Sequence, residues 1–300
     1  MSGGNGSRRG VSRGGGTMAG AVGESSRVAE IARTGPPYDG LVIFDNHLHF
    51  GHAPAVFEAA ADPVELARQM SRIGIRVAVV SSIWAIFSGD IRAGNDEVLA
   101  ALDRFPDRYL GYVVVHPAYP ELLASELERC LRHPRMRGIK LHPTEYSHPV
   151  KITDPRYRPA FEYARDHGYP ILIHTGPEAQ RAYCGAEEVA KVAREFPSVP
   201  VILAHTMGFD RWEGVEEAVA VAARLDNAYV DLSGSAGRHY GLVEYAVQRA
   251  GSEKILYGSD VPQLTFTFPL GPVFYADIPD RDKENILGLN TARMFDIPLP

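Results

Sequence analysis

The fold of this chain is decided by residues 171–206, which read ILIHTGPEAQRAYCGAEEVAKVAREFPSVPVILAHT. Two short apolar runs, Pro170–Ile173 and Val201–Ala204, lie at the two ends of this stretch and are typical of buried strands. Between them, Ala186–Phe196 carries apolar residues at helical spacing. The stretch therefore predicts a strand, a helix and a second strand that runs parallel to the first.

The same unit recurs along the chain from residue 38 onward. Further strands are expected at Leu41–Phe44, Val77–Ser81, Leu110–Val115, Gly138–Leu141, Ala228–Leu232 and Ile255–Gly258. Further helices are expected at Pro63–Ile73, Asn95–Phe105, Pro120–His133, Arg156–His167, Val215–Leu225, Leu242–Ala250 and Asp280–Leu289. Eight such units predict an α/β fold, a closed (β/α)8 TIM barrel over residues 37–300. The first strand is not followed by G-x-G-x-x-G, so nothing indicates a dinucleotide site.

Residues 1–36 differ in composition from the rest of the chain. They are rich in glycine, serine and arginine and contain no aromatic residue. Such a composition cannot bury enough apolar surface to form a core, so we expect a disordered N-terminal tail.

Composition excludes several classes of function. The 300 residues carry a net charge of −6, which argues against general nucleic-acid binding. Only two cysteines occur, Cys130 and Cys184, so neither a disulfide framework nor a cysteine-based zinc cluster is expected. No apolar run approaches the length of a membrane span and no signal peptide is visible, so we expect a cytoplasmic protein without membrane contact.

Reactive side chains occur where the predicted strands end, which is where barrels of this type place their active sites. They are His47 and His49 after strand one, Lys140 and His142 after strand four, His174 after strand five, His205 after strand six and Asp260 after strand eight.

His47 and His49 are two positions apart on one strand, so both imidazoles face the barrel axis and can share one ion. His174 adds a third nitrogen from across the barrel, and Asp260 adds an oxygen. A convergence of unpaired polar groups is costly in a core, which favours a divalent metal site. A polar ligand pocket without an ion is the alternative.

These motifs resemble the amidohydrolase superfamily. The resemblance rests on His47-Leu-His49, His174-Thr-Gly176, His205 and Gly258-Ser-Asp260, and it covers roughly residues 41–296. Gly138-Ile-Lys-Leu-His-Pro143 and Tyr257-Gly-Ser-Asp-Val-Pro262 resemble the amidohydrolase-related (amidohydrolase 2) branch of metal-dependent hydrolases. That branch also contains decarboxylases similar to aminocarboxymuconate semialdehyde decarboxylase.

The resemblance implies a role for each matching residue. His47, His49 and His174 would bind the metal, with Asp260 completing or adjoining the set. Asp260 and His205 would be the catalytic residues, one transferring protons and the other acting beside the metal-bound water. Three nitrogens and one oxygen suit one Zn²⁺ best, with Mn²⁺, Fe²⁺ or Co²⁺ as alternatives.

Lys140 has three interpretations. A carboxylated Lys140 would bridge two metals, as in some members of the superfamily. An ordinary ammonium would attract a substrate carboxylate, with His142 on the same face of the strand. A structural lysine paired with a carboxylate of the barrel is the third.

Aromatic and arginine side chains in the loops after the strands suggest a small anionic substrate. We expect substrate contacts from Lys140, His142, Trp84, Arg211, Arg238 and Tyr240.

Three functions remain open at this point. The first is a metal-dependent hydrolase of a small carboxylate-bearing lactone, amide or ester. The second is a non-oxidative decarboxylase of a small aromatic or unsaturated acid, which would use the same ligands. The third is a metal-free ligand-binding barrel. Homodimers are expected only by analogy with other barrels.

Overall fold

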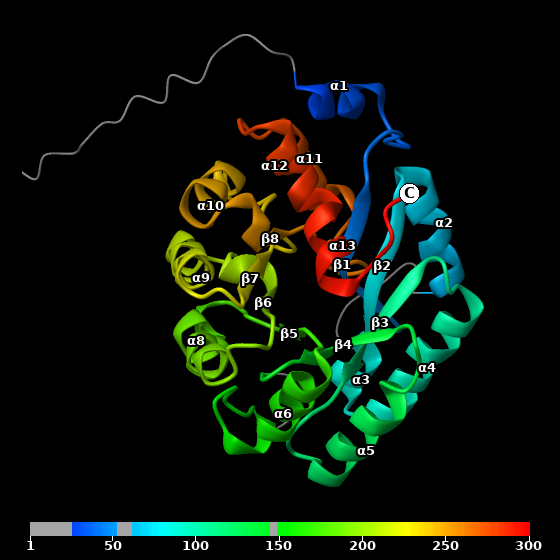
Figure 1. Ribbon diagram of the computed structural model, residues 1–300, viewed down its shortest axis with the longest axis vertical. Helices are drawn as coiled ribbons and strands as arrows, with labels where there is room; N and C mark the ends of the chain where they lie inside the picture. Colours follow the sequence, from blue (N-terminus) through cyan, green and yellow to red (C-terminus); the bar gives the residue numbers. More distant parts are fainter. Residues whose placement is uncertain (1–25, 53–61, 145–148) are drawn as a thin grey trace, which may run out of the picture.

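The computed structural model describes residues 26–52, 62–144 and 149–300. Within them, eight parallel strands follow one another around a barrel in chain order (Figure 1). They are β1 Ile43–Phe50, β2 Ile75–Ser82, β3 Tyr109–Val114, β4 Met136–Leu141, β5 Ile171–Ile173, β6 Val201–Leu203, β7 Ala228–Asp231 and β8 Ile255–Leu256. Backbone hydrogen bonds from Asn46 to Tyr257 and from His49 to Val261 join β1 to β8 and the residues after it. The expected (β/α)8 barrel is therefore confirmed.

Helices surround the strands (Figure 1). They are α1 Arg27–Thr34, α2 Pro63–Ile73, α3 Ile83–Ser88, α4 Ile91–Arg104, α5 Pro120–Cys130, α6 Arg158–His167, α7 Arg181–Cys184, α8 Ala186–Glu195, α9 Trp212–Arg224, α10 Leu242–Ala250, α11 Thr267–Tyr275, α12 Asp280–Glu284 and α13 Asn290–Phe295. The bounds of α2 are the expected ones, because Asp62 accepts hydrogen bonds from the first turn and Gly74 ends the helix in the left-handed region. The single helix expected over Asp280–Leu289 is instead α12, followed by a π-helical segment, Asn285–Leu289, that leads into α13.

Helix α1 corrects one expectation. Residues 27–34 were expected to be disordered, but they form a helix whose Val28 and Ala32 are buried. The helix lies beside α11 and α12 (Figure 1), and the Ser26 hydroxyl that caps it also contacts Asp280. Tertiary packing thus orders a segment whose composition alone predicts disorder, while residues 1–25 of the expected tail lie outside the described residues.

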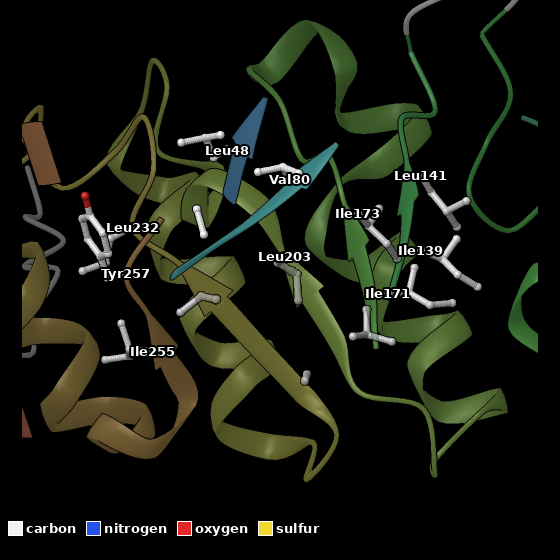
Figure 2. Close-up of a cluster of buried hydrophobic side chains, with 14 of the residues drawn as sticks. Leu48, Val80, Ile139, Leu141, Ile171, Ile173, Leu203, Leu232, Ile255 and Tyr257 are labelled. Atoms are coloured by element: carbon white, nitrogen blue, oxygen red, sulfur yellow. The ribbon is translucent and has the colours of Figure 1, made fainter. Parts of the chain in front are cut away.

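Side chains that alternate along the strands build two apolar layers. Ile171, Ile173 and Leu203 belong to the layer between strands and helices (Figure 2). Their neighbours Leu172 and Ile202 belong to a smaller cluster that also contains Phe44, Tyr112 and, from α13, Phe295. This second cluster fills the barrel interior, so the polar side chains at the carboxyl ends of the strands stand on an apolar floor.

Candidate active site

A β-bulge in β1 turns the side chains of His47 and His49 towards the barrel interior. Between Asp45 and Leu48 the strand contains one residue more than the matching part of β2. Such a bulge shifts the alternation of side chains by one position. Phe44 before the bulge belongs to the barrel interior, and after it His47 and His49 have the inward places. Their Nε2 atoms lie 3.1 Å apart, so the expectation that they share one face is confirmed.

Asp260 meets this pair from the other end of the sheet. Its Oδ1 lies 3.2 Å from His49 Nε2 and 3.7 Å from His47 Nε2. The Asp260 backbone is left-handed, with a φ of 59°, and its N–H donates to His47 O over 2.8 Å. This local strain turns the carboxylate back towards β1.

These three residues fit a divalent metal ion. A carboxylate oxygen of Asp231 lies 2.9 Å from His47 Nδ1, which holds the imidazole proton there and leaves a lone pair on Nε2. The Ser81 hydroxyl oxygen lies within hydrogen-bond distance of His49 Nδ1, at 2.9 Å. Ligand atoms on one zinc-sized ion lie about 3 to 3.5 Å apart, which is close to the spacing found among the two nitrogens and the oxygen. Two imidazoles and a carboxylate form a donor set that suits first-row divalent metals.

His174 and His205 form a second pair across the barrel mouth. His205 Nε2 lies 3.2 Å from His174 Nδ1, and the His205 ring is 5.0 Å from that of His47. His174 Nε2 faces the Gln180 amide at 3.0 Å rather than the group formed by His47, His49 and Asp260. The structure brings His174 into the same cavity, but its role as third metal ligand stays a prediction.

The loop that carries His205 is strained. His205, Thr206 and Met207 all have positive φ values, of 62°, 45° and 51°. Residues with side chains rarely adopt this left-handed conformation, which costs roughly 1–2 kcal/mol per residue. Three such residues in a row indicate that surrounding contacts hold the turn in place.

Lys140 lies inside the site and not at its rim. The side chain is buried, and Nζ is 3.0 Å from His47 Nε2. Burial lowers the pKa of Lys140 to about 8, so an ammonium still predominates at neutral pH. His142 stacks on His174 with 3.8 Å between ring centroids, as expected from its place on the same face as Lys140.

Burial also fixes the charges of the other groups. It lowers the pKa of His205 to about 3 and lowers those of His47 and His174 well below the usual range, so these imidazoles are neutral. Burial opposes ionisation of Asp260 as well. The neighbouring His205 and the pair on β1 outweigh that effect and hold the pKa of Asp260 well below its ordinary value.

A cavity of about 280 Å³ opens onto these groups. The polar part of its wall comprises His49, Lys140, His142, His174, Gln180, His205, Asp260 and Gln263. The apolar part comprises Ile83, Ile86 and Phe87 of α3 together with Pro177 and Phe209. The Phe209 ring packs 4.5 Å from that of His205, so an apolar surface directly adjoins the candidate catalytic group.

Four expected substrate-binding residues are not among those that line this cavity. Trp84 is on α3 but about one third exposed. Arg211 is paired with Glu178 at 3.1 Å. Arg238 lies behind Phe209, with its guanidinium 5.8 Å from the centre of that ring, and fully exposed Tyr240 lines a different hollow. Contact of these residues with a substrate stays a prediction that the cavity does not support.

Asp231 is the main residue that the sequence analysis missed. It is the last residue of β7 and is fully buried, and it contacts both His47 and the His205 loop. The signal that could have found it is the one used elsewhere, a polar residue at the exit of an apolar strand. Gln180 and Gln263 carry no such signal, because Gln180 ends a short 3-10 helix and Gln263 stands in a turn, both beyond the strand ends.

No helix in the described ranges is long and apolar enough to cross a membrane.

A family model described as "Amidohydrolase" matches residues 44–297. Among solved structures, 2,6-dihydroxybenzoate decarboxylase from Rhizobium is 16% identical, covers 86% of this chain and 99% of its own, and superposes with a TM-score of 0.67. 5-carboxyvanillate decarboxylase from Sphingomonas paucimobilis is 18% identical, covers 86% of this chain and 100% of its own, and superposes with a TM-score of 0.63.

A third similar structure contains a metal. It is dihydroxybenzoic acid decarboxylase from Polaromonas sp. JS666 with bound manganese and the inhibitor 2-nitroresorcinol. It is 17% identical, covers 87% of this chain and 98% of its own, and has a TM-score of 0.68. At these identities the likeness establishes a shared fold.

Proposed function

We propose, from the premise that this chain belongs to the amidohydrolase family of enzymes, that it is a metal-dependent, non-oxidative decarboxylase of a small aromatic or unsaturated acid. The first expectation from the sequence was a hydrolase, which the family match supports only coarsely. Several similar solved structures are named as decarboxylases, which favours the second expectation, a decarboxylase.

The observation that carries the proposal is the division of the cavity wall into a polar part and an apolar part. An aromatic acid has a flat apolar ring and a charged carboxylate at one edge. The apolar wall formed by α3, Pro177 and Phe209 suits the ring, and Lys140 with the histidines suits the charged edge. A volume of about 280 Å³ is just below the range of about 300–1,000 Å³ that is usual for ligand sites, which favours a single-ring substrate.

His47, His49 and Asp260 would hold the divalent metal, with His174 as a further ligand from β5. When bound, such an ion supplies a positive charge that holds the carboxylate and an adjacent substrate oxygen. Zinc was the expected metal from the sequence. The manganese of the Polaromonas enzyme supports the wider choice of a first-row divalent ion.

The chain's own residues would bind the acid and supply the proton. Decarboxylation breaks the bond between the carboxylate and the ring, releases CO₂, and leaves an electron pair on the ring carbon that must take up one proton. Lys140 would attract the carboxylate by charge. Asp260 and His205 line the cavity and are unprotonated at rest, so each can accept a proton from solvent water and pass it to carbon. A group with a lowered pKa is seldom protonated but gives up its proton readily.

The test is product analysis of the metal-loaded enzyme in deuterated water. The panel contains 2,6-dihydroxybenzoate, 5-carboxyvanillate, other hydroxybenzoates, and a lactone and an ester that carry a carboxylate. We expect CO₂ release from an aromatic acid and one deuterium at the carbon that lost the carboxylate. His49→Ala should abolish this reaction, whereas His133→Ala, which changes a partly exposed histidine paired with Asp103, should not.

Cleavage of the lactone or ester with uptake of ¹⁸O from labelled water, and no CO₂ from any acid, would instead establish the hydrolase. A purified protein that binds these acids without containing or needing a divalent metal would establish the ligand-binding barrel.

A further inference from the structure

We propose that Asp231 is a positioning residue of this site: it orders the protons of the histidine network so that the Nε2 atoms of His47, His205 and His174 keep their lone pairs. The inference rests on the proposed metal site and deepens it. Asp231 is fully buried at the end of β7, and its two carboxylate oxygens serve different partners.

The first oxygen sets the tautomer of His47. Asp231 Oδ2 lies 2.9 Å from His47 Nδ1. An ionised carboxylate can only accept hydrogen bonds, so the single proton of a neutral His47 must be on Nδ1. His47 Nε2 is then left with a lone pair, and this is the atom that faces His49 and Asp260.

The second oxygen starts a chain of hydrogen bonds that runs in one direction. The Ser233 hydroxyl donates to Asp231 Oδ1. It has no second hydrogen, so at its 2.9 Å contact with His205 Nδ1 it must accept. His205 therefore has its proton on Nδ1 and a lone pair on Nε2.

The same logic continues to β5. His205 Nε2 can only accept from His174 Nδ1, 3.2 Å away, so the proton of His174 is on Nδ1 too. His174 Nε2 is then an unprotonated nitrogen. The Gln180 amide beside it can donate from its NH₂ group after a half turn that exchanges its oxygen and nitrogen. One carboxylate on β7 thus leaves a lone pair on Nε2 of His47 and on Nε2 of His174, where Lys140 and Gln180 respectively can donate a hydrogen bond.

Asp231 also holds the strained turn. Its Oδ1 accepts from the backbone N–H of His205 over 2.9 Å, and its backbone carbonyl accepts from the Thr206 hydroxyl. Both donors belong to the run of left-handed residues after β6. The residue that orders the protons therefore also fixes where the His205 ring stands.

Histidine tautomers of the metal-free, full-length protein test this directly, because long-range ¹H–¹⁵N correlation spectra distinguish Nδ1–H from Nε2–H. We expect Nδ1–H for His47, His205 and His174 in the wild type, with signals assigned from single histidine variants. An Nε2–H tautomer at His47 in the wild type would overturn the proposal.

Asp231→Asn provides the second arm. The amide keeps the size of the side chain and can still accept from His205, but its NH₂ group donates towards His47 and should move the His47 proton to Nε2. We expect Mn²⁺ affinity, measured by titration of the metal-free protein, to fall about 10- to 100-fold. Unchanged tautomers and unchanged affinity in this variant would overturn the proposal. Asp226→Asn, an exposed carboxylate just before β7, is the matched control.

Ser233→Ala keeps the test decisive if Asp231→Asn does not fold. It cuts the branch to His205 and removes a 3.1 Å contact of the Ser233 hydroxyl with His47 Nδ1, but it leaves the 2.9 Å contact between Asp231 and His47 Nδ1. The His205 and His174 tautomers should become mixed while His47 stays Nδ1–H, and kcat should fall more than KM rises. Fixed tautomers at all three residues would contradict the proposal. A wild type that releases no CO₂ would overturn the proposed function alone, because the tautomers are measured without metal or substrate.

Discussion

Three buried aspartates of the site differ in pKa because their surroundings differ. Burial raises the pKa of Asp45 to about 7, and it raises the pKa of Asp231 as well. Asp260 faces three imidazoles, which outweigh the cost of burial and keep it ionised. The pKa of a carboxylate in this barrel therefore depends on the partners that the strand ends bring to it.

Asp260→Asn should abolish decarboxylation, with a loss of about 10³-fold or more in kcat. The amide removes both the negative charge next to the two β1 nitrogens and the ability to carry a proton. Metal analysis of the purified variant should show less than one ion per chain. A variant with normal metal content and normal CO₂ release would contradict the role of Asp260.

Lys140→Met should raise KM for an anionic substrate at least tenfold, because methionine keeps the length of the side chain without its charge. In the wild type, KM should rise above pH 8, since deprotonation of Lys140 removes the same charge. Lys191→Met, on an exposed lysine paired with Glu188, is the control and should change neither value. A fall from two bound metals to one in Lys140→Met would instead support the carboxylated, bridging lysine.

Among single residues, the sequence identified those that lie at the carboxyl end of a strand or shortly beyond it. His47, His49 and Asp260 meet because parallel strands bring their carboxyl ends to one rim. Arg211 and Arg238 were selected only for their chemistry and their place in loops. Whether a loop side chain turns to the cavity or to a neighbouring glutamate depends on tertiary packing, which no local pattern encodes.

Among the elements, α2 and α10 have their expected bounds, α4 begins at Ile91 and not at the expected Asn95, and α1 was missed. Its first turn is capped by Ser26, and its inner face contributes Val28 and Ala32. These are small apolar groups in a polar, glycine-rich context. The contacts that order them come from α11 and α12, more than 230 residues further along the chain.

Val28→Ala should lower the free energy of unfolding by about 1–2 kcal/mol, because it deletes two buried methyl groups and leaves space behind. Urea denaturation would measure the change. Arg33→Ala, on the exposed face of the same helix, should leave stability within about 0.5 kcal/mol of the wild type. Equal stability of wild type and Val28→Ala would mean that α1 does not belong to the folded unit.

For the whole molecule, the alternation of strands and helices was enough to predict eight units and their closure. The position of the apolar floor was not predictable, because it needs Phe295 of α13 to pack against Tyr112 inside the barrel, with 5.7 Å between ring centroids. This contact joins β3 to the last helix of the chain, and the sequence pattern of neither element alone indicates it.

Acid should destabilise the whole fold partly through His116, a buried residue after β3 that accepts a hydrogen bond from the Ala118 backbone. Burial lowers the pKa of His116 from 6.5 to about 4. Between those pH values the unfolded chain binds a proton at this position and the folded chain does not. Stability therefore falls as pH drops through the window, by up to about 1.4 kcal/mol per pH unit from this group.

His116→Asn keeps a hydrogen-bond acceptor near Ala118 and removes the titrating ring. The slope of unfolding free energy against pH between 6.5 and 4 should be shallower in this variant than in the wild type. Parallel slopes would show that His116 does not contribute to acid sensitivity.

The division of the cavity wall has a consequence for how such a protein can change. The ionisable groups of the wall lie on β1 and β4 or follow β4, β5, β6 and β8, whereas Ile83, Ile86 and Phe87 lie on α3, which carries none of them. The α3 segment can thus be exchanged by grafting or by natural drift while the reacting groups keep their places. A change of ligand preference through α3 therefore does not require a change in the ionisable residues.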